Sequence, residues 1–492
     1  MSTELMNESA TRSSYESGLG DWVKQEKAAI DLIKILGTLW YDRSVELIMF
    51  RNQLVDRSAS QILALHQYAK EMVKKPVSIF DSLQIAEELV KVHLAPSRID
   101  LGRLTSEWIN EKAKYNDSTT DFISDKLRNY IGEEKHKIVP KDVVLYGFGR
   151  IGRILARELV AQAGKGEQLR LRAIVTRDKS DEDMIKRAEL LRNDSVHGAF
   201  LGTVVEDIPN RTLIINGHIV HMISAKNPEE IDYSAYGIND ALLIDNTGVA
   251  RDREGLSRHL KSKGVSKVLL TAPGKGDIPN VVYGINQKSH NEDETIFSAA
   301  SCTTNAIVPV LAVIDRTLGI QRGHIETIHS YTNDQNLLDN YHSKYRRGRS
   351  APLNMVITET GADKAVSKAL PQLAGKISGN SVRVPTPNVS LAILNIAINK
   401  EITKEGVNEI MRDAALNGDL VEQIQYLTSN ETVSSDLVGN PCASIFDSPA
   451  TIVSKDNKNL VLYVWYDNEY GYSRQVLRFA KYLSNVIRLT YY

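Results

Sequence analysis

The first 137 residues carry apolar positions at the spacing of α-helices. One helix face is formed by positions i, i+3, i+4 and i+7 of a single segment: Leu32, Ile35, Leu36 and Leu39. The apolar run at 45–50 belongs to the same helical region. Two pairs of helix-capping residues precede further helical repeats: Ser58 with Gln61, and Ser78 with Asp81. This pattern predicts an all-α domain over residues 1–137, in which His66 is structural.

The pattern changes after a charged linker at 132–137. Short apolar runs typical of buried strands occur at 143–146, 171–175, 242–244 and 268–270. A helical repeat follows the first run at 153–163, and residues 388–399 alternate as a strand would. Buried strands that alternate with helices predict an α/β fold with a doubly wound sheet. A last helix is predicted over 474–487.

Composition limits the possible functions. The chain has 492 residues, which is too long for one ordinary core, and a net charge of −1 gives no field for binding nucleic acid. The two cysteines do not form a disulfide framework and fit a reducing compartment. No apolar run reaches the length of a membrane span, and the N-terminus lacks a signal core. We expect a cytoplasmic protein without a metal site.

A glycine motif lies between the first strand and the first helix of the doubly wound region. The segment Gly147-Phe148-Gly149-Arg150-Ile151-Gly152 has the G-x-G-x-x-G spacing in this context. Gly147 permits the tight turn, Gly149 allows the backbone to approach a pyrophosphate, and Gly152 allows close helix–strand packing. The helix N-terminus holds the phosphate charge. The motif predicts a Rossmann-type dinucleotide-binding domain over 141–301.

The residues after the second strand concern the choice between NAD and NADP. An acidic residue there binds the ribose hydroxyls of NAD, but this chain has Thr176 and Arg177, followed by Asp178. A hydroxyl and a guanidinium can bind the 2′-phosphate of NADP. The alternative, in which Asp178 still reaches the ribose of NAD, stays open.

Other candidate cofactor contacts follow later strands of the sheet. Ligands of a doubly wound sheet bind at the carboxyl edge of its strands, which here carries Thr247, Gly248 and Thr271. Asp245 lies in the same turn as Thr247, and we expect its carboxylate to be solvated.

The segment around Cys302 is the candidate for nucleophilic chemistry. Cys302 precedes an apolar helical run, so its thiol lies at a helix N-terminus, which favours the thiolate. His329 lies 27 residues downstream and supplies a possible base. Cys442 has no basic neighbour and is expected to be structural.

Four separate strings in this region resemble one family. The strings SCTTN (301–305), HSYTNDQ (329–335), RVPTPNVS (383–390) and WYDNEYGYS (465–473) closely resemble the signature of glyceraldehyde-3-phosphate dehydrogenases. The resemblance runs from about Val143 to the C-terminus and leaves the first 140 or so residues uncovered. It implies an α+β catalytic domain over 302–467, with a C-terminal helix in 468–492 that completes the cofactor domain.

The resemblance also implies roles for single residues. Cys302 would form a hemithioacetal with the aldehyde and then a thioacyl intermediate, with His329 as the base. Further cofactor contacts would be Arg150, Ile151, Lys226 and Asn468. One phosphate site would consist of Ser301, Thr303, Thr360 and Gly361, and the other of Thr332 and Arg383. The substrates would be a phosphorylated aldehyde, inorganic phosphate and NAD or NADP.

The sequence therefore predicts a phosphorylating glyceraldehyde-3-phosphate dehydrogenase that acts reversibly in glycolysis or gluconeogenesis, as a homo-oligomer resembling the family's tetramer. One alternative is an erythrose-4-phosphate dehydrogenase, which shares the fold and thiol but hydrolyses its intermediate. Another is a regulatory or binding protein that retains a dehydrogenase body. The N-terminal extension either packs on the enzyme and extends an oligomer interface, or serves as a regulatory docking module.

Overall fold

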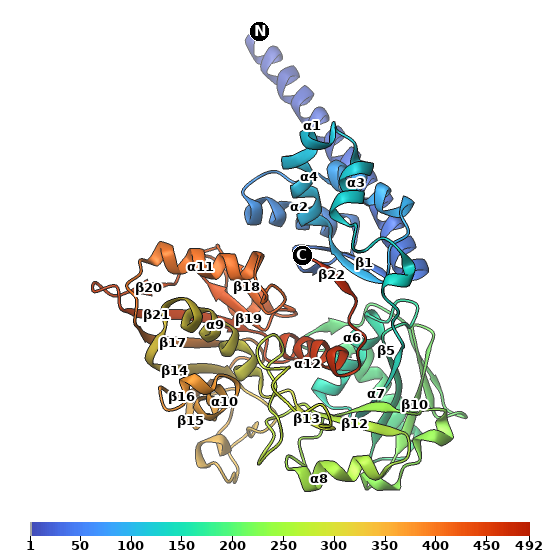
Figure 1. The fold of residues 1–492 in the computed structure, drawn as a ribbon, viewed down its shortest axis with the longest axis vertical. Helices are drawn as coiled ribbons and strands as arrows, with labels where there is room; N and C mark the ends of the chain where they lie inside the picture. Colours follow the sequence, from blue (N-terminus) through green and yellow to red (C-terminus); the bar gives the residue numbers. More distant parts are fainter. Residues whose placement is uncertain (1) are drawn as a thin grey trace. The chain divides into compact units, whose positions relative to one another are not determined.

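The computed structural model describes residues 2–492, with the backbone alone described for residues 2–14, Glu71, Glu133 and Asp363. The chain divides into two compact units (Figure 1). The first consists of Met1–Val139, Gly164–Glu167 and Ile487–Tyr492, and the second of Pro140–Ala163 and Gln168–Val486. None of the described helices is both long and apolar enough to cross a membrane.

The first unit contains a β-sheet, so the prediction of an all-α domain over 1–137 is wrong. Strands β1 (Val45–Met49) and β3 (Ser97–Asp100) pair in parallel, and β2 (Asn52–Gln53) pairs antiparallel with β1. Every residue of β1 is buried. A parallel strand covered on both faces has no polar–apolar alternation, and its apolar run resembles that of a buried helix.

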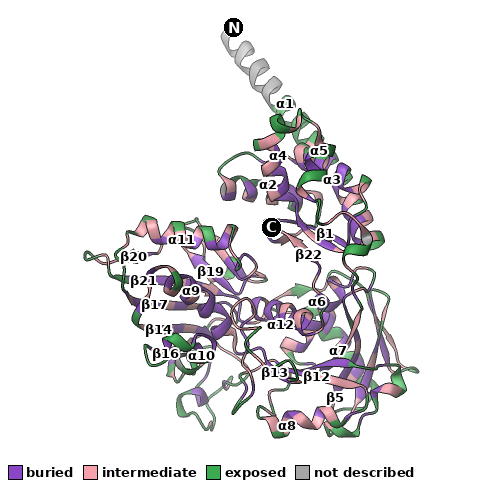
Figure 2. Cartoon of the chain, viewed as in Figure 1, coloured by how far each residue is buried: buried purple, intermediate pink, exposed green. Residues whose placement is uncertain are grey.

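The first unit also contains α-helices, and the first three lie in segments that the sequence predicts to be helical. They are α1 (Ser2–Gly37), α2 (Ala59–Val73), α3 (Ile79–Lys91), α4 (Leu101–Glu111) and α5 (Thr119–Lys126). Ser58 and Gln61 form the predicted capping box of α2, and the Ser78 hydroxyl caps α3. Side chains of these helices and of β1 form one apolar core that includes Leu32, Leu47, Ile85 and Leu104 (Figure 2).

The last residues of the chain belong to the first unit. Strand β22 (Leu489–Tyr491) pairs in parallel with β3 and completes the order β2-β1-β3-β22 (Figure 1). The last helix, α12 (Tyr470–Leu483), ends before this strand. The predicted helix over 474–487 is therefore shifted by one turn, and residues 487–492 do not complete the cofactor domain as expected.

The N-terminal half of the second unit has the predicted doubly wound sheet. Its strand order is β13-β12-β11-β4-β5-β10-β9-β8, and the strands from β13 to β10 pair in parallel. The bounds are β4 (Lys141–Tyr146), β5 (Leu169–Thr176), β8 (Val204–Asp207), β9 (Thr212–Ile215), β10 (His218–Ser224), β11 (Ala241–Asp245), β12 (Val265–Leu270) and β13 (Ile296–Ser298). Helices α6 (Arg150–Ala161), α7 (Asp181–Arg192) and α8 (Arg253–Ser257) connect strands of the sheet.

A mixed sheet forms the rest of the second unit. Its order is β15-β16-β14-β17-β21-β19-β18, with β20 (Ile452–Val453) beside β21. The bounds are β14 (Ile320–Ser330), β15 (Val356–Thr358), β16 (Ile377–Val384), β17 (Ser390–Ile398), β18 (Ile424–Leu427), β19 (Ser444–Asp447) and β21 (Asn459–Tyr466). Helices α9 (Cys302–Leu318), α10 (Ala362–Ala369) and α11 (Lys404–Leu416) share an apolar core with these strands (Figure 2). The proposed division of the second unit at residue 301 stays a prediction.

Candidate active site

Cys302 is the first residue of α9, and a short turn after β13 holds it there. The Ser298 hydroxyl accepts a hydrogen bond from the Ala300 backbone N–H at 3.0 Å, and Ala300 has a φ of +54°. The Asn305 amide donates to the Ala299 carbonyl at 2.8 Å. Ser301 caps α9 by accepting from the Thr304 backbone N–H at 3.0 Å. These bonds place the thiol at a helix N-terminus, as the sequence predicts.

His329 reaches this thiol from the end of β14. Its Nε2 lies 3.6 Å from Cys302 Sγ, and its Nδ1 lies 2.7 Å from the Ser330 carbonyl oxygen. Arg383 is paired with His329 in the β14–β16 register, and its Nη1 lies 2.9 Å from His329 Nδ1. The structure therefore brings together the predicted nucleophile, the predicted base and one predicted phosphate ligand.

Burial shifts the pKa values of both Cys302 and His329. Desolvation raises the pKa of the Cys302 thiol, although the positive charge of Arg383 and hydrogen bonds at the start of α9 oppose this shift. Desolvation and then the charge of Arg383 lower the pKa of His329 to about 3. The start of α9 and the charge of Arg383 thus favour the thiolate, and desolvation opposes them.

A cavity of about 520 Å³ opens onto the pair. Nine of the predicted site residues line it: Arg150, Ile151, Thr271, Ser301, Cys302, His329, Thr332, Arg383 and Asn468. The Asn468 side-chain oxygen accepts a hydrogen bond from the Ser390 hydroxyl at 2.9 Å. A cavity of this size with a nucleophile, an imidazole and a guanidinium on one side suits a small anionic substrate.

The residues of the predicted Ser301–Gly361 phosphate site do not all line one cavity, and the site stays a prediction. Thr303 is 8% exposed, and its hydroxyl lies 3.0 Å from the hydroxyl of the buried Tyr466. Thr360 accepts from the Ala362 backbone N–H at 3.2 Å, and Gly361 precedes α10. Thr303, Thr360 and Gly361 do not line the cavity that contains Ser301.

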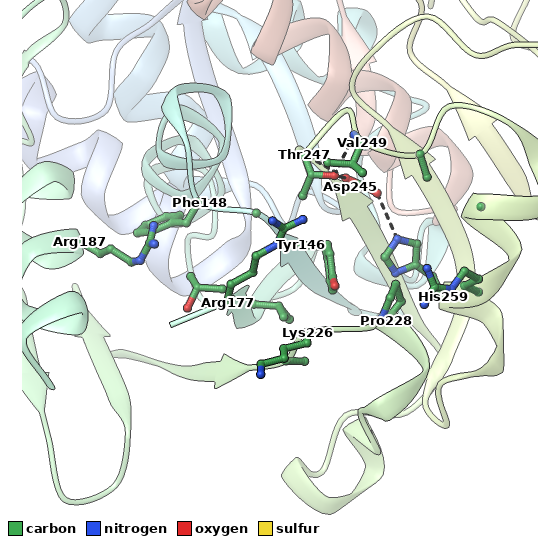
Figure 3. Close-up of a pocket in the computed structure, with 17 residues that line it drawn as sticks. Tyr146, Phe148, Arg177, Arg187, Lys226, Pro228, Asp245, Thr247, Val249 and His259 are labelled. Atoms are coloured by element: carbon green, nitrogen blue, oxygen red, sulfur yellow. Dashed lines mark hydrogen bonds and ion pairs between the residues drawn. The ribbon is translucent and has the colours of Figure 1, made fainter. Parts of the chain in front are cut away.

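A second cavity, of about 290 Å³, lies at the carboxyl edge of the doubly wound sheet (Figure 3). It is lined by six of the predicted cofactor contacts: Gly147, Phe148, Thr176, Arg177, Lys226 and Thr247. Arg187, Arg258 and Asp245 also line it, and the two arginines pair with Asp183 and Glu229 respectively. Asp178 does not line this cavity, since its carboxylate accepts from the Ser180 backbone N–H at 2.8 Å, and Gly248 does not line it either.

The glycine motif has the geometry that a pyrophosphate requires. Gly147 has a φ of +94°, and a Cβ there would lie 2.9 Å from the Thr247 side chain. A Cβ on Gly152 would lie 2.5 Å from the Gly147 carbonyl oxygen, whereas one on Gly149 would meet nothing within 4 Å. The turn is therefore tight at both ends and open at Gly149, in front of the α6 N-terminus.

Two family models match the second unit. A glyceraldehyde 3-phosphate dehydrogenase NAD-binding domain matches residues 141–253, and the C-terminal domain of the same family matches residues 301–468. A glyceraldehyde-3-phosphate dehydrogenase-like protein of Pseudomonas aeruginosa is 48% identical over 92% of this chain and 98% of its own length. This chain belongs to the glyceraldehyde-3-phosphate dehydrogenase family. It is an oxidoreductase whose cofactor is NAD(P).

Relatives in the family differ in whether they align with the N-terminal extension. Glyceraldehyde-3-phosphate dehydrogenase A of Zea mays chloroplasts is 42% identical over 70% of this chain and 82% of its own length. The enzyme of Zymomonas mobilis is 37% identical over 70% of this chain and 99% of its own length. The Zymomonas protein thus has almost no residues left to match the extension, whereas the alignment with the Pseudomonas protein includes most of it.

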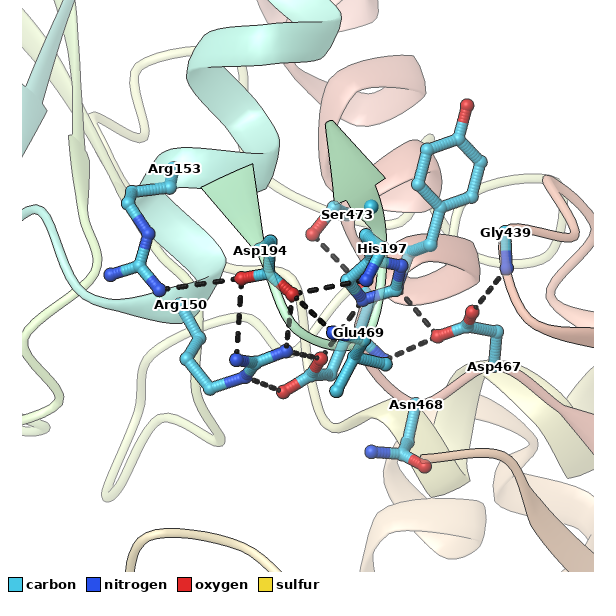
Figure 4. A network of polar contacts seen from close by, with 12 residues as sticks. Arg150, Arg153, Asp194, His197, Gly439, Asp467, Asn468, Glu469 and Ser473 are labelled. Carbon is cyan, nitrogen blue, oxygen red and sulfur yellow. Dashed lines mark hydrogen bonds and ion pairs between the residues drawn. The ribbon is translucent and has the colours of Figure 1, made fainter. Parts of the chain in front are cut away.

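The structure also contains an ion-pair network around Arg150 that the sequence did not predict (Figure 4). The Glu469 carboxylate accepts from Arg150 and lies 2.9 Å from His197 Nε2. Arg150 also lies 3.3 Å from Asp194, which accepts from the His197 backbone N–H at 3.0 Å. Arg150 and its neighbours hold the loop after α7 against the segment that carries Asn468. The string WYDNEYGYS (465–473) contains Glu469, and the string NDSVHG (193–198), which resembles another segment of the family, contains Asp194. Neither string indicates that these side chains pair with Arg150.

Asp245 and His259 form a second unpredicted pair. Both side chains are 2% exposed, and His259 Nε2 lies 3.1 Å from Asp245 Oδ2. The other carboxylate oxygen of Asp245 accepts from the Thr247 backbone N–H and from the Thr247 hydroxyl, each at 2.7 Å (Figure 3). The expectation that Asp245 is solvated is wrong, because His259 and Thr247 surround its carboxylate. This pair fixes the turn that carries Thr247.

Proposed function

We propose that this protein is a phosphorylating glyceraldehyde-3-phosphate dehydrogenase, which converts D-glyceraldehyde 3-phosphate and inorganic phosphate reversibly to 1,3-bisphosphoglycerate. The observation that carries the proposal is the 3.6 Å approach of His329 Nε2 to Cys302 Sγ in a cavity that also contains Arg383 and Thr332. A thiol beside an imidazole is suited to covalent catalysis on a carbonyl, and a guanidinium beside them is suited to a phosphate.

The proposed chemistry begins with addition of Cys302 Sγ to the aldehyde carbon. The thiol proton passes through His329 Nε2 to the carbonyl oxygen, which gives a hemithioacetal and leaves a neutral imidazole. His329 then takes the hydroxyl proton of this adduct as hydride departs and a thioester forms on Cys302. Bound NAD(P) would supply the hydride acceptor. Inorganic phosphate attacks the thioester carbon, the C–S bond breaks, and the Cys302 thiolate takes the proton held by His329.

Other predicted site residues bind and orient the phosphate groups and the cofactor. Arg383 and Thr332, whose Nη1 and Oγ1 lie 3.5 Å apart, form one proposed phosphate site. Ser301, Thr303, Thr360 and Gly361 remain the candidates for the other. Asn468 positions the nicotinamide, and the open turn at Gly149 accommodates the pyrophosphate.

We infer that the protein accepts NADP as well as NAD. The inference is supported by the basic side chains of Arg177 and Lys226 in the second cavity, and by the engagement of Asp178 with Ser180 outside it. Asp245, the acidic residue of this cavity, is held by His259 and Thr247. Thr176 and Arg177 stand at the end of β5, where an acidic residue would repel a 2′-phosphate. Replacing Arg177 by Glu is expected to raise KM for NADP about tenfold or more and to change KM for NAD little; equal effects on both cofactors would contradict the inference.

We also propose a homo-oligomer, as in the family's tetramer. The loop at 334–353 supports this proposal, because it exposes five large apolar side chains: Leu337, Leu338, Tyr341, Tyr345 and Leu353.

Steady-state reduction of NAD and of NADP by glyceraldehyde 3-phosphate, with and without inorganic phosphate, tests the proposal. Phosphate-dependent turnover that is lost in Cys302→Ser is the expected result. Turnover that does not depend on inorganic phosphate, or a preference for erythrose 4-phosphate, would support the alternative function of an erythrose-4-phosphate dehydrogenase. A partner-binding phenotype that survives Cys302→Ser, without turnover in the wild type, would support the binding protein.

A further inference from the structure

Arg150 lies in the glycine motif, but two carboxylates occupy its guanidinium. It makes four hydrogen bonds, two to Glu469 and two to Asp194 (Figure 4). A guanidinium has five N–H groups, so one remains for a ligand. The side chains of Glu469 and Asp194 are 13% and 7% exposed. Arg150 therefore lines the 520 Å³ cavity as a link between two other segments rather than as a free cation.

Glu469 is held at both of its carboxylate oxygens. Oε1 accepts from Arg150 Nε, and Oε2 accepts from Arg150 Nη2 at 2.5 Å and lies 2.9 Å from His197 Nε2. Burial tends to raise the pKa of Glu469, but hydrogen bonds from Arg150 and His197 bring it below its ordinary value. Glu469 is therefore a carboxylate at neutral pH, and its contact with Arg150 is a charged, bidentate pair.

The turn that carries Glu469 also carries Asn468, and this turn is rigid (Figure 4). The Asp467 carboxylate accepts from the backbone N–H groups of Glu469 at 2.9 Å and Tyr470 at 2.7 Å, and from that of Gly439 at 2.8 Å. Asp467 is 1% exposed, so water does not replace these bonds. Asn468 thus lies between two anchored residues, and a displacement of Glu469 would move it.

The two ends of this link have different proposed partners on a dinucleotide. The turn at Gly149 is the proposed site of the pyrophosphate, and Asn468 is the proposed ligand of the nicotinamide. Once one group of a ligand is bound, the second binds at an effective concentration that depends on how well the spacing of the two sites matches the ligand. A fixed spacing therefore strengthens the binding of the whole dinucleotide, but not of a fragment without the nicotinamide.

We propose that Glu469 and Arg150 are positioning residues for the cofactor: their ion pair fixes the spacing between the glycine motif and Asn468, and so selects the complete dinucleotide over its fragments. This proposal rests on the proposed cofactor contacts at Gly149 and Asn468. It assigns the pyrophosphate to the backbone N–H groups at the start of α6 rather than to the Arg150 guanidinium.

Isothermal titration calorimetry of the full-length protein with NAD, and with ADP-ribose, which lacks the nicotinamide, tests the proposal. Glu469→Gln keeps the size of the side chain but removes its charge. We expect its Kd for NAD to rise about tenfold and its Kd for ADP-ribose to change less than about twofold. In steady-state assays KM for NAD should rise and kcat should fall, whereas KM for the aldehyde should stay the same.

Arg150→Lys breaks the same link from its other end, since one ammonium cannot replace a guanidinium that pairs with two carboxylates. This variant should also weaken the binding of NAD alone, and it serves if Glu469→Gln folds poorly. The double variant should bind NAD about as tightly as the weaker single variant, because both changes break one interaction.

Glu158→Gln is the matched control. Glu158 of α6 accepts from Arg474 of α12 at 2.6 Å, and the two side chains are 11% and 9% exposed, so this ion pair is as buried as that of Glu469. Neither residue lines the cavity. The control variant should lower the Tm but leave the ratio of the two Kd values unchanged.

Equal weakening of NAD and ADP-ribose binding by Arg150→Lys would show that the guanidinium contacts the pyrophosphate, and would overturn the proposal. Unchanged Kd values in Glu469→Gln, or an equal change of the ratio in Glu158→Gln, would also overturn it. Because calorimetry needs neither aldehyde nor inorganic phosphate, the expected Kd values without turnover would retain this inference and reject the proposed function.

Discussion

At the scale of single residues, Ser390 determines how Asn468 faces the cavity. The Ser390 hydroxyl donates to the Asn468 side-chain oxygen at 2.9 Å and accepts from the Ser330 backbone N–H at 3.1 Å. Ser390 and Asn468 are both buried, so water does not replace these bonds. With its oxygen held, Asn468 has its side-chain N–H groups available for a ligand.

Replacing Ser390 by Ala should therefore weaken cofactor binding without destroying the fold. Loss of one hydrogen bond of about 0.5–1.5 kcal/mol corresponds to a rise of about two- to tenfold in KM for NAD. Ser444→Ala is the matched control, because Ser444 is equally buried but donates to the Ala306 carbonyl at 2.5 Å, away from Asn468. If both variants raised KM alike, Ser390 would have only a packing role.

The residue scale also shows what a sequence can and cannot predict about a site. Cys302, His329, Arg383 and Asn468 lie in strings whose spacing carries the family signature, and the structure places all four on one cavity. The Asp245–His259 pair has no such signal: its members lie on different elements, and only the tertiary fold brings the imidazole to the carboxylate. The polar turn around Asp245 therefore predicts a solvated carboxylate, although the side chain is buried.

At the scale of elements, capping residues predict the start of a helix reliably, whereas an unbroken apolar run does not distinguish a helix from a strand. Ser58 and Gln61 predicted the start of α2 because their side-chain bonds to the helix end are local. The apolar run at 45–50, which contains β1, shows no alternation of polar and apolar residues, since both faces of the strand are buried. Short apolar runs of this kind suit a buried strand and a buried helix equally.

The packing of α2 on α3 should depend on pH. His66 of α2 is buried, and its Nε2 lies 3.0 Å from the hydroxyl of Ser82 on α3. Desolvation lowers the pKa of His66 below its ordinary value of 6.5. The unfolded chain therefore binds more protons than the folded one once the pH falls below 6.5, so stability is complete above that pH and decreases below it.

Hydrogen–deuterium exchange can measure this effect. Amides of α2 and α3 should open several-fold more often at pH 5.5 than at pH 7.5, after correction for the intrinsic exchange rate. In His66→Gln the protection should be lower at both pH values but nearly independent of pH. An unchanged pH dependence in the variant would assign the effect to another group.

At the scale of the whole molecule, the two units share one chain in an interleaved order. The first unit takes residues from both ends of the sequence and from Gly164–Glu167. Within it, the Tyr130 hydroxyl donates to the Thr490 carbonyl at 2.6 Å, and the Tyr491 hydroxyl donates to Glu107 at 2.5 Å. The guanidinium of Arg488 lies 4.5 Å from the centre of the Trp40 ring. The C-terminus is thus a structural part of the N-terminal extension.

A protein that ends at Val486 should lose stability in the first unit alone. It lacks β22, the hydrogen bonds of Thr490 and Tyr491, and the contact of Arg488 with Trp40. Limited proteolysis should cleave residues 15–139 at least about tenfold faster, while NAD reduction should persist. Tyr491→Phe, which removes one hydrogen bond, should show a much smaller effect. Equal protection of the truncated and complete chains would show that β22 contributes nothing to the sheet.

The place of β22 also has a consequence for synthesis on the ribosome. An N-terminal domain usually folds while the rest of its chain is still being made. Here the sheet lacks this strand until Leu489–Tyr491 has been synthesised and has left the exit tunnel, because these residues pair with Ser97–Ile99. The edge of β3 stays unpaired throughout elongation of the second unit, so a chain that terminates before Leu489 exposes an unpaired strand edge.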